Sequence, residues 1–413
     1  MRIKRIAALL LAAVCGVSML SGCAGKTADQ QDSGTGSELN IPEYDFDDTE
    51  HNEYSSAVDD AMDTGMTTLE FTAGIKVGWN LGNTLDATGN SGLSTETSWG
   101  NPKTTEELFL AVKEAGFNAI RVPTTWEKHM DEEHNIDPDW MNRVTEVVDY
   151  AYKNDMYVIL NMHHEGWNHP YEDNKEAAAE IMTKAWTQIA ENFKGYSERL
   201  IFEGMNEPRW VGTDYEWNGG NDEGRSVVNY LNQVFVDAVR ATGGNNAQRF
   251  LMVPAYAANS GEDALSALVL PSDPANRIIV SVHAYTPYSF ALQGNGSAKW
   301  LAERPTCTRD IDTLAEVLDR LFISKGVAVI IGETGAMNRN MTDDDGNTVS
   351  NEVYRAEWSE YFTSTFRKIG IPCFFWDNAA FTSGETFGIF NRMTYECKYP
   401  DYVAGAVRGA EAE

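Results

Sequence analysis

From residue 74 onward, short apolar runs alternate with longer stretches whose apolar residues recur with a helical period. The runs are rich in β-branched and aromatic residues, which is typical of buried parallel strands. Strands are expected at 75–81, 119–123, 157–163, 200–205, 250–255, 278–284, 327–332 and 372–377. Helices are expected at 105–115, 139–153, 176–193, 223–241, 309–324 and 352–368, the first with a capping box of Thr104 and Glu107.

Eight strands that alternate with helices predict an α/β fold, a (β/α)8 TIM barrel in a single catalytic domain. The alternative is a doubly wound sheet. That fold usually has a glycine-rich phosphate loop after its first strand, and GWNLGNTLD at 78–86 does not match the pattern. The barrel is therefore the better interpretation.

Polar and aromatic residues stand where the predicted strands end. In a barrel these ends converge on one face, which holds the active site. The residues so placed are Arg121, His163, His164, Asn206, Glu207, His283, Tyr285, Glu333 and Trp376. Glu203 lies four residues before Glu207 in its strand, so we expect it inside the barrel, paired with a polar neighbour.

The N-terminal segment differs from the rest of the chain. Residues 1–22 have a basic start, a short apolar stretch and small residues before Cys23, which predicts a lipoprotein signal peptide and a lipid on Cys23. An ordinary signal peptide is the alternative. Residues 23–63 are polar and acidic, so they are expected to form a disordered tether. The barrel domain is then 64–413.

The net charge of −30 argues against nucleic acid and anionic polymers as partners, and suits a neutral substrate. Solubility of an exported protein also explains it. Of the five cysteines, Cys373 is expected to be a buried thiol, and a Cys307–Cys397 bridge is left open.

Two patterns resemble metal sites. His164 and His169 are five residues apart after a strand, whereas a zincin needs a spacing of four on a helix. The segment 341–352 is acidic at spacings like those of an EF-hand, but its first ligand position is Met341, so an acidic surface turn is the better interpretation. Neither a metal nor a cofactor is expected.

Glu207 and Glu333, which come from different strands, suit glycoside hydrolysis. This reaction needs a protonated acid on the leaving oxygen and a carboxylate at the anomeric carbon, so the surroundings must separate the two pKa values. Arg121 and Tyr285 are candidates to keep Glu333 ionised, and Asn206 is a candidate to bind the sugar 2-hydroxyl. A short distance between the carboxyl groups would predict retention, and a longer one inversion.

Seven motifs in order cover about residues 70–400: NLGNTLDA, NAIRVPTTW, LNMHHE, FEGMNEPRW, VSVHAYTPYSF, IIGETGA and FFWDN. Together they resemble glycoside hydrolase family 5 and are most similar to its subfamily 4, the endo-β-1,4-glucanases and xyloglucanases. The resemblance implies a retaining mechanism with Glu207 as acid/base and Glu333 as nucleophile. It also implies a substrate site of Arg121, His163, Asn206, His283, Tyr285 and Trp376, with His164, Asn83 and Trp217 as further sugar contacts.

The expected protein is an endo-acting β-1,4-glucanase, a monomeric lipoprotein of the cell surface that meets the membrane only through its lipid. The β-glucan is a cellulose-type polymer, a mixed-linkage glucan or a xyloglucan. Three alternatives are a non-catalytic glycan-binding lipoprotein, a metal-dependent barrel hydrolase and a β-mannanase of the same family.

Overall fold

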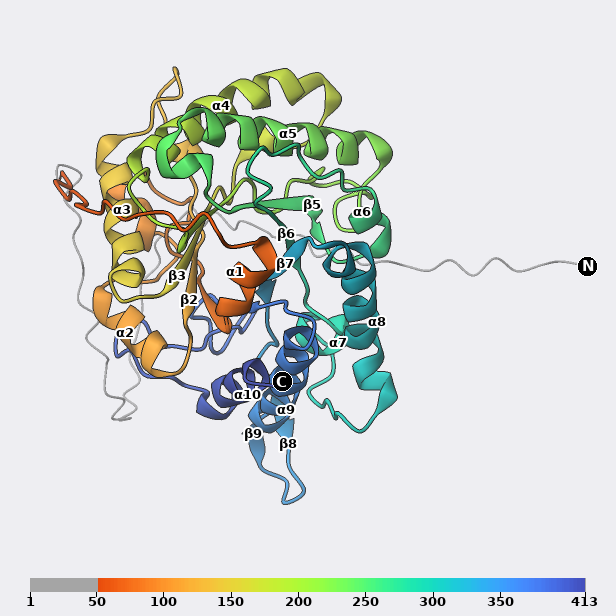
Figure 1. Cartoon of the computed structure of the whole chain (residues 1–413). Coiled ribbons are helices and arrows are strands. Elements are labelled where there is room, and N and C mark those ends of the chain that lie inside the picture. Colours follow the sequence, from red (N-terminus) through yellow and green to blue (C-terminus); the bar gives the residue numbers. More distant parts are fainter. Residues whose placement is uncertain (1–50, 413) are drawn as a thin grey trace, which may run out of the picture. The chain divides into compact units, whose positions relative to one another are not determined.

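Eight parallel strands close into a barrel in the computed structural model, which describes residues 51–412 (Figure 1). The strands are β1 (Val77–Leu81), β2 (Ala119–Val122), β3 (Tyr157–Asn161), β4 (Leu200–Glu203), β5 (Leu251–Asn259), β6 (Ile278–His283), β7 (Ala328–Thr334) and β10 (Cys373–Asp377). They follow chain order around the barrel, and β10 closes it by pairing with β1. The predicted (β/α)8 barrel is confirmed, and each expected strand is present.

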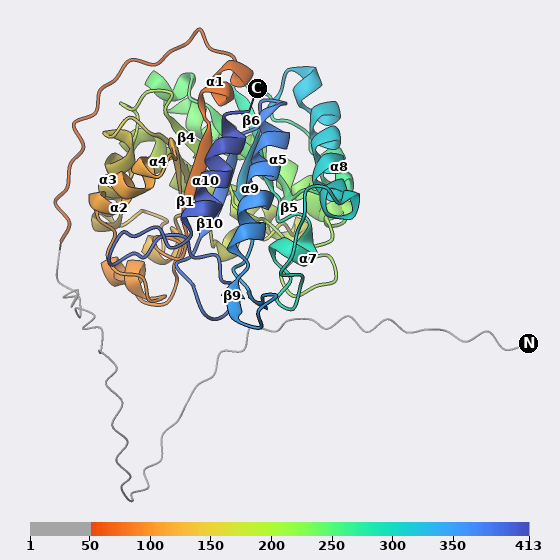
Figure 2. The ribbon, with the colours of Figure 1, turned by 90° about the horizontal axis from the view of Figure 1, so that it is seen from below.

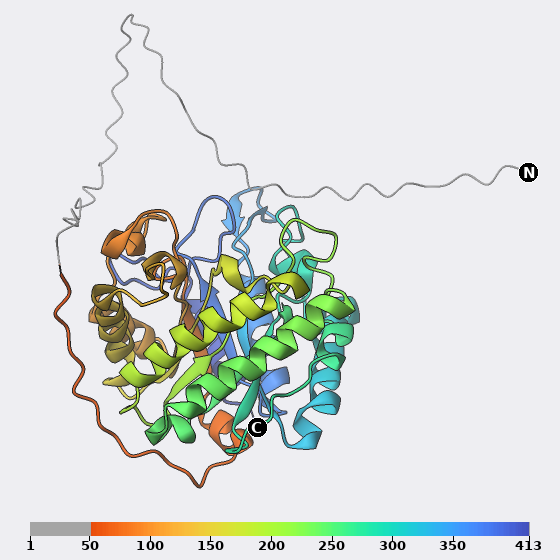
Figure 3. The ribbon, with the colours of Figure 1, turned by 90° about the horizontal axis from the view of Figure 1, so that it is seen from above.

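Helices surround the strands. The six expected helices are α2 (Glu106–Glu114), α3 (Pro138–Tyr152), α4 (Lys175–Asn192), α5 (Asp222–Ala241), α8 (Pro305–Leu321) and α9 (Glu352–Arg367). Four others were not expected: α1 (Thr68–Gly74), α6 (Glu262–Ser266), α7 (Tyr288–Ala291) and α10 (Pro400–Ala410). Short 3-10 turns occupy Gly92–Thr97, Glu127–His129, Gly166–Asn168, Glu172–Asn174, Gly244–Ala247 and Ile323–Lys325. Helices α9 and α10 run side by side (Figure 2), as do α4 and α5 (Figure 3).

The capping box predicted for α2 is wrong. The helix begins at Glu106, after Thr105, and the backbone N–H of Thr104 donates to the Glu96 carboxylate at 2.7 Å. A capping box does form at α1, where the Thr67 hydroxyl accepts from the backbone of Glu70 and the Glu70 carboxylate accepts from that of Thr67. This pairing satisfies backbone donors that a helix start leaves free.

One end of the barrel interior is apolar. This apolar layer consists of Phe71, Ile75, Ala119, Ile159, Ile201, Phe250, Met252, Ile279, Ala328, Ile330 and Phe374, all fully or almost fully buried. Helix α1 closes this end, because its Phe71 stacks on Phe250 with ring centroids 3.9 Å apart. Gly78 is paired with Phe374, and a Cβ on Gly78 would lie 2.1 Å from the Phe374 ring. The glycine therefore makes room for the aromatic ring.

The opposite end carries the hairpin of β8 (Asn340–Thr342) and β9 (Thr348–Ser350). Figures 2 and 3 both show α1 at one end of the barrel and this hairpin at the other. Its turn is exposed, and the Asp343 carboxylate accepts the backbone N–H groups of Asp345 and Asn347 at 3.0 and 2.7 Å. The interpretation of 341–352 as an acidic surface turn is confirmed.

Residues 51–63 differ from the disordered tether expected there. They lie along the domain, where the Tyr54 hydroxyl donates to Asp149 and the backbone N–H of Asp60 donates to the carbonyl of Gly195 at 2.8 Å. The prediction relied on the acidic composition, which does not reveal that the Tyr54 side chain has a partner on α3 and the Asp60 backbone a partner in the loop before β4. The domain therefore begins before residue 64.

The predicted signal peptide, the lipid site at Cys23 and the first part of the tether lie outside the described residues. Within residues 51–412, no helix has the length and the apolar character needed to cross a membrane. Cys307 and Cys397 are free thiols, so the bridge left open by the sequence is absent. Cys373 is a buried thiol, as expected, and burial raises its pKa.

Candidate active site

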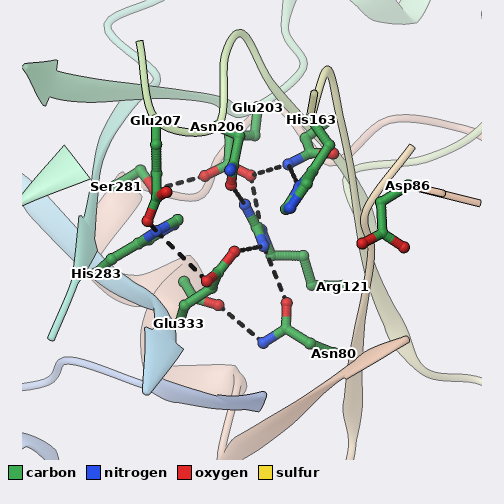
Figure 4. A network of polar contacts seen from close by, with 12 residues as sticks. Asn80, Asp86, Arg121, His163, Glu203, Asn206, Glu207, Ser281, His283 and Glu333 are labelled. Carbon is green, nitrogen blue, oxygen red and sulfur yellow. Dashed lines mark hydrogen bonds and ion pairs between the residues drawn. The ribbon is translucent and has the colours of Figure 1, made fainter. Parts of the chain in front are cut away.

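Arg121 of β2 is the centre of a buried polar network at the hairpin end of the strands (Figure 4). Its Nε donates to Glu203 at 2.7 Å, and its Nη2 donates to Oδ1 of Asn206 at 2.7 Å. Its Nη1 donates to Glu333 at 2.7 Å. The side chain is fully buried, so this one cation joins the fully buried Glu203 to the nearly buried Glu333.

Glu203 lies inside the barrel with polar neighbours, as the sequence predicted. Besides Arg121, it accepts from the Ser281 hydroxyl at 2.5 Å and from the Asn161 amide at 3.1 Å. These donors leave no uncompensated charge on a fully buried carboxylate. Asn161 Nδ2 also lies 3.1 Å from Nδ1 of His163.

Glu333, at the end of β7, accepts hydrogen bonds from two groups. Arg121 contacts one carboxylate oxygen, and the Tyr285 hydroxyl donates to the other at 3.1 Å. Burial raises the pKa of Tyr285 well above its usual value, and the charge of Glu333 raises it further, so the phenol stays a donor. The contacts expected for Glu333 are therefore present.

Glu207 shares its surroundings with a histidine. Its Oε1 lies 2.8 Å from Nδ1 of His283, which is also 3.6 Å from Glu333. Burial lowers the pKa of His283, but the charges of Glu333 and Glu207 outweigh burial, and the pKa lies above its ordinary value. Burial raises the pKa of Glu207, but the hydrogen bond and charge of His283 outweigh it, and the pKa is lowered. Both shifts favour a protonated His283 beside an ionised Glu207.

The two carboxylates are close together. One oxygen of Glu207, one of Glu333 and a ring nitrogen of His283 all lie within 4.8 Å of one another. This spacing also suits a metal ion, as does that of Asp86, His163 and His164. An anchored anion beside a carboxyl group that shares a proton can provide both a nucleophile and an acid or base.

Three further aromatic residues line this face. His163 and Trp376 are nearly parallel, with ring centroids 5.8 Å apart. His164 turns its edge to His163, and its side chain is 39% exposed. Burial lowers the pKa of His163 well below its usual value and that of His164 to about 4, so both rings are neutral at working pH.

Asn83 and Trp217 are not among the hydrogen-bond partners of Arg121. Asn83 has a left-handed backbone, φ 56°, and its N–H donates to the buried Asp86 carboxylate at 3.1 Å. Burial raises the pKa of Asp86 to about 7. Trp217 is 56% exposed and stacks over Arg209, whose guanidinium lies 3.6 Å from the Glu207 carboxylate.

Four residues of the site were missed from the sequence: Asn80, Asp86, Arg209 and Ser281. Asn80 accepts from Arg121 at 3.0 Å and donates to the carbonyl of Gly332 at 3.0 Å. The signal for Asn80 and Ser281 was available, because each is a polar residue inside an otherwise apolar strand that is buried on both faces. Arg209 had no such signal, since it stands in a loop.

Comparison with known proteins agrees with this geometry. The family model "Cellulase (glycosyl hydrolase family 5)" matches residues 84–382. Endoglucanase B of Ruminococcus albus is 41% identical over 420 aligned positions, which cover 100% of this chain and 98% of the relative.

Two solved structures are also similar. A subfamily 4 broad-specificity endoglucanase from Ruminococcus champanellensis with bound cellotriose is 44% identical, with a TM-score of 0.77 over 83% of this chain and 98% of that one. A family 5 xyloglucan-specific endo-β-1,4-glucanase from a metagenomic library, in complex with cellotriose, is 41% identical, with a TM-score of 0.76 over 82% and 98%. The barrel, the seven motifs and these matches together show that the chain belongs to glycosyl hydrolase family 5.

Proposed function

We propose that this endo-β-1,4-glucanase cleaves its substrate with retention of configuration, with Glu333 as nucleophile and Glu207 as acid/base. The observation that carries the proposal is that oxygens of the two carboxylates lie within 4.8 Å of each other. Retaining glycosidases keep their carboxyl groups about 5–5.5 Å apart, whereas inverting enzymes leave room for a water between them. This upper limit on the separation fits the retaining class.

In the first step, Glu333 attacks the anomeric carbon while the proton of the Glu207–His283 pair passes through Glu207 to the leaving glycosidic oxygen. This forms a glycosyl ester on Glu333 and releases the new chain end. In the second step, Glu207 as a carboxylate takes a proton from water, whose oxygen displaces Glu333 and restores it. Arg121 and Tyr285 hold the attacking carboxylate in place, so little reorganisation is needed.

Sugar binding is assigned to the residues around the pair. The Oδ1 of Asn206 is used by Arg121, which leaves its amide N–H groups for a sugar hydroxyl. Trp376, stacked on His163, offers a flat surface to a sugar ring. His164, Asn83 and the exposed Trp217 are assigned to more distant sugars. The substrate is a β-1,4-glucan backbone, and xyloglucan is included because a similar structure is specific for it.

We further propose that the chain is a monomer attached to the cell surface through a lipid on Cys23. Support comes from the small residues before Cys23 and the acidic segment after it. A purely glycan-binding role is not favoured, because both carboxylates are present with their partners. A β-mannanase is not favoured either, because the similar proteins described above act on glucans.

The test uses residues 51–413, so that the segment packed on α3 is kept. Reducing ends released from cellulose, mixed-linkage glucan, xyloglucan and mannan are measured for the parent, Glu207→Gln, Glu333→Gln and a surface control, Glu262→Gln. We expect both active-site variants to lose about 10²–10⁴-fold or more in kcat, while the control keeps full activity. Inversion of the anomeric product, seen by NMR, would contradict the mechanism, and activity on mannan alone would contradict the substrate.

A further inference from the structure

The loop that follows β4, residues 208–221, is fixed to its neighbours. The backbone N–H of Trp210 donates to the Tyr256 hydroxyl at 2.7 Å, and its indole N–H donates to the carbonyl of Pro170 at 2.7 Å. The indole also stacks on Tyr171, with ring centroids 4.9 Å apart. The backbone next to Arg209 is therefore held by contacts on two sides.

The guanidinium of Arg209 is held from three directions. Its Nη1 donates to the backbone carbonyl of Glu207 at 3.0 Å, and its Nε donates to the Glu216 carboxylate at 3.3 Å. The guanidinium lies over the indole of Trp217, with 4.1 Å between the guanidinium carbon and the ring centroid. Glu216 is in turn held by the N–H of Gly212 at 2.8 Å. An arginine with 22% exposure is thus fixed in one place.

The guanidinium of Arg209 is held beside one particular oxygen of Glu207. Arg209 Nη1 is 3.6 Å from Oε2, whereas His283 is 2.8 Å from Oε1. A distance of 3.6 Å is too long for a hydrogen bond but short for two opposite charges. The positive charge therefore acts on Oε2 without occupying it, and this oxygen stays available to a proton or to a glycosidic oxygen.

We propose that Arg209 is a positioning residue that sets the proton affinity of Glu207, and that Trp217 and Glu216 hold it at the distance where it does so. The inference rests on the proposed function of Glu207. A nearby positive charge favours the carboxylate, which the second step needs as a base, and opposes the protonated form, which the first step needs as an acid. The distance keeps this bias moderate, so that one group can perform both steps.

Other charged and titratable groups also act on Glu207. They are His283, which is hydrogen-bonded to it, Glu333, which has an oxygen within 4.8 Å, and His164, Glu385 and Arg121 around the same pair. Glu333 and Glu385 favour the protonated form, and Arg209 opposes them. Arg209 belongs to the 208–221 loop. The conformation of this loop is therefore coupled to the protonation of Glu207.

The first experiment measures kcat/KM against pH on a soluble β-glucan for the parent, Arg209→Gln and Arg209→Lys. Loss of the charge makes the Glu207–His283 pair hold its proton more strongly. We expect Arg209→Gln to move the alkaline limb up by about half to one pH unit, a shift reduced by solvent screening. Arg209→Lys, which keeps a charge but not the guanidinium group over the Trp217 ring, should move it less. Arg320→Gln, at an exposed pair with Glu262, is the control.

The second experiment uses an aryl cellobioside with a good leaving group, for which the first step needs no acid and the second step limits kcat. Activity then falls at low pH as Glu207 gains a proton. Arg209→Gln should move this acidic limb up as well, so both limbs move in the same direction. Trp217→Ala should give part of the same shift, and Trp217→Phe, which keeps a ring under the guanidinium, should give less.

A purely structural role for Arg209 would lower activity at every pH without moving either limb, and this result would overturn the inference. Limbs of Arg209→Gln that coincide with those of the parent would overturn it too. The proposed function fails separately, if Glu207→Gln keeps the activity and the pH profile of the parent. Circular dichroism of each variant and its unfolding midpoint verify that the chains compared are folded.

Discussion

Two layers of side chains inside the barrel, only two residues apart along the same strands, differ in polarity. Ala119, Ile159, Ile201 and Ile279 belong to the apolar layer. Two positions further along these strands stand Arg121, Asn161, Glu203 and Ser281, which belong to one hydrogen-bonded network. Because side chains alternate between the two faces of a strand, each pair points into the barrel.

The difference shows how the barrel separates stability from chemistry. The apolar layer, closed by α1, needs only to exclude water and fill space. The polar layer above it must satisfy every buried charge, since one missing partner leaves an ion uncompensated. The hydrogen bonds and ion pairs that satisfy these charges fix the positions of the groups. The site at the strand ends therefore rests on a rigid layer. Four substitutions test this division, in order of decreasing effect.

Arg121→Met should have the largest effect, because it leaves Glu203 and Glu333 buried without their cation. We expect the free energy of unfolding to fall by about 3–5 kcal/mol at neutral pH, together with loss of activity. Urea unfolding followed by fluorescence measures it. Adding Glu203→Gln to the same chain should restore part of the stability but not the activity. A loss below about 1 kcal/mol would show that the network does not depend on its cation.

Ile201→Ala removes a large side chain from the apolar layer. We expect a loss of about 2–4 kcal/mol in the free energy of unfolding, from lost burial and from the cavity left behind. Activity per folded molecule should stay unchanged, since the polar layer keeps all its partners. A large fall in kcat at temperatures where the variant is folded would contradict the separation of the two layers.

His283→Asn tests whether His283 helps to hold the proton that Glu207 passes to the leaving oxygen. The pKa of His283 is raised by its neighbouring carboxylates, so its proton is held more strongly than on an ordinary histidine and is lost as the pH rises through that raised pKa. In the variant the proton must sit on Glu207 alone, which is a weaker base. The alkaline limb of kcat/KM should therefore move down by about one unit, worth about 1.4 kcal/mol. This is opposite to the shift expected for Arg209→Gln.

Thr67→Ala should have the smallest effect, because it removes one half of the capping box of α1. The expected loss is about 1 kcal/mol, measured by urea unfolding, with unchanged activity. Thr394→Ala, at an exposed turn threonine whose backbone N–H and not its hydroxyl is hydrogen-bonded, provides a matched control. If Thr67→Ala leaves the stability unchanged, α1 does not depend on its cap to close the barrel.

The sequence predicted the strands well because both faces of each are buried, which makes apolar runs conspicuous. It predicted Glu207, Glu333 and Arg121 because a strand end is a recognisable place for a polar residue in this fold. It did not predict α1, because seven residues are too few for a clear helical period.

The remaining errors have two causes. The capping box predicted at Thr104 does not form, because the N–H of Thr104 donates instead to the Glu96 side chain, eight residues away in the sequence. The folded segment 51–63 was missed for the same reason, since its partners Asp149 and Gly195 are distant in the chain. The role inferred for Arg209 also depends on a loop conformation that no local pattern encodes.

The pairing of Gly78 with Phe374 has a consequence for the evolution of this barrel. The two residues share one volume, because a Cβ at position 78 would overlap the aromatic ring. Neither position can drift alone: a side chain at 78 requires a smaller residue at 374, and a glycine at 78 opposite a small residue leaves a hole. Among descendants of this sequence, the two positions should therefore change together, as compensating substitutions across neighbouring strands.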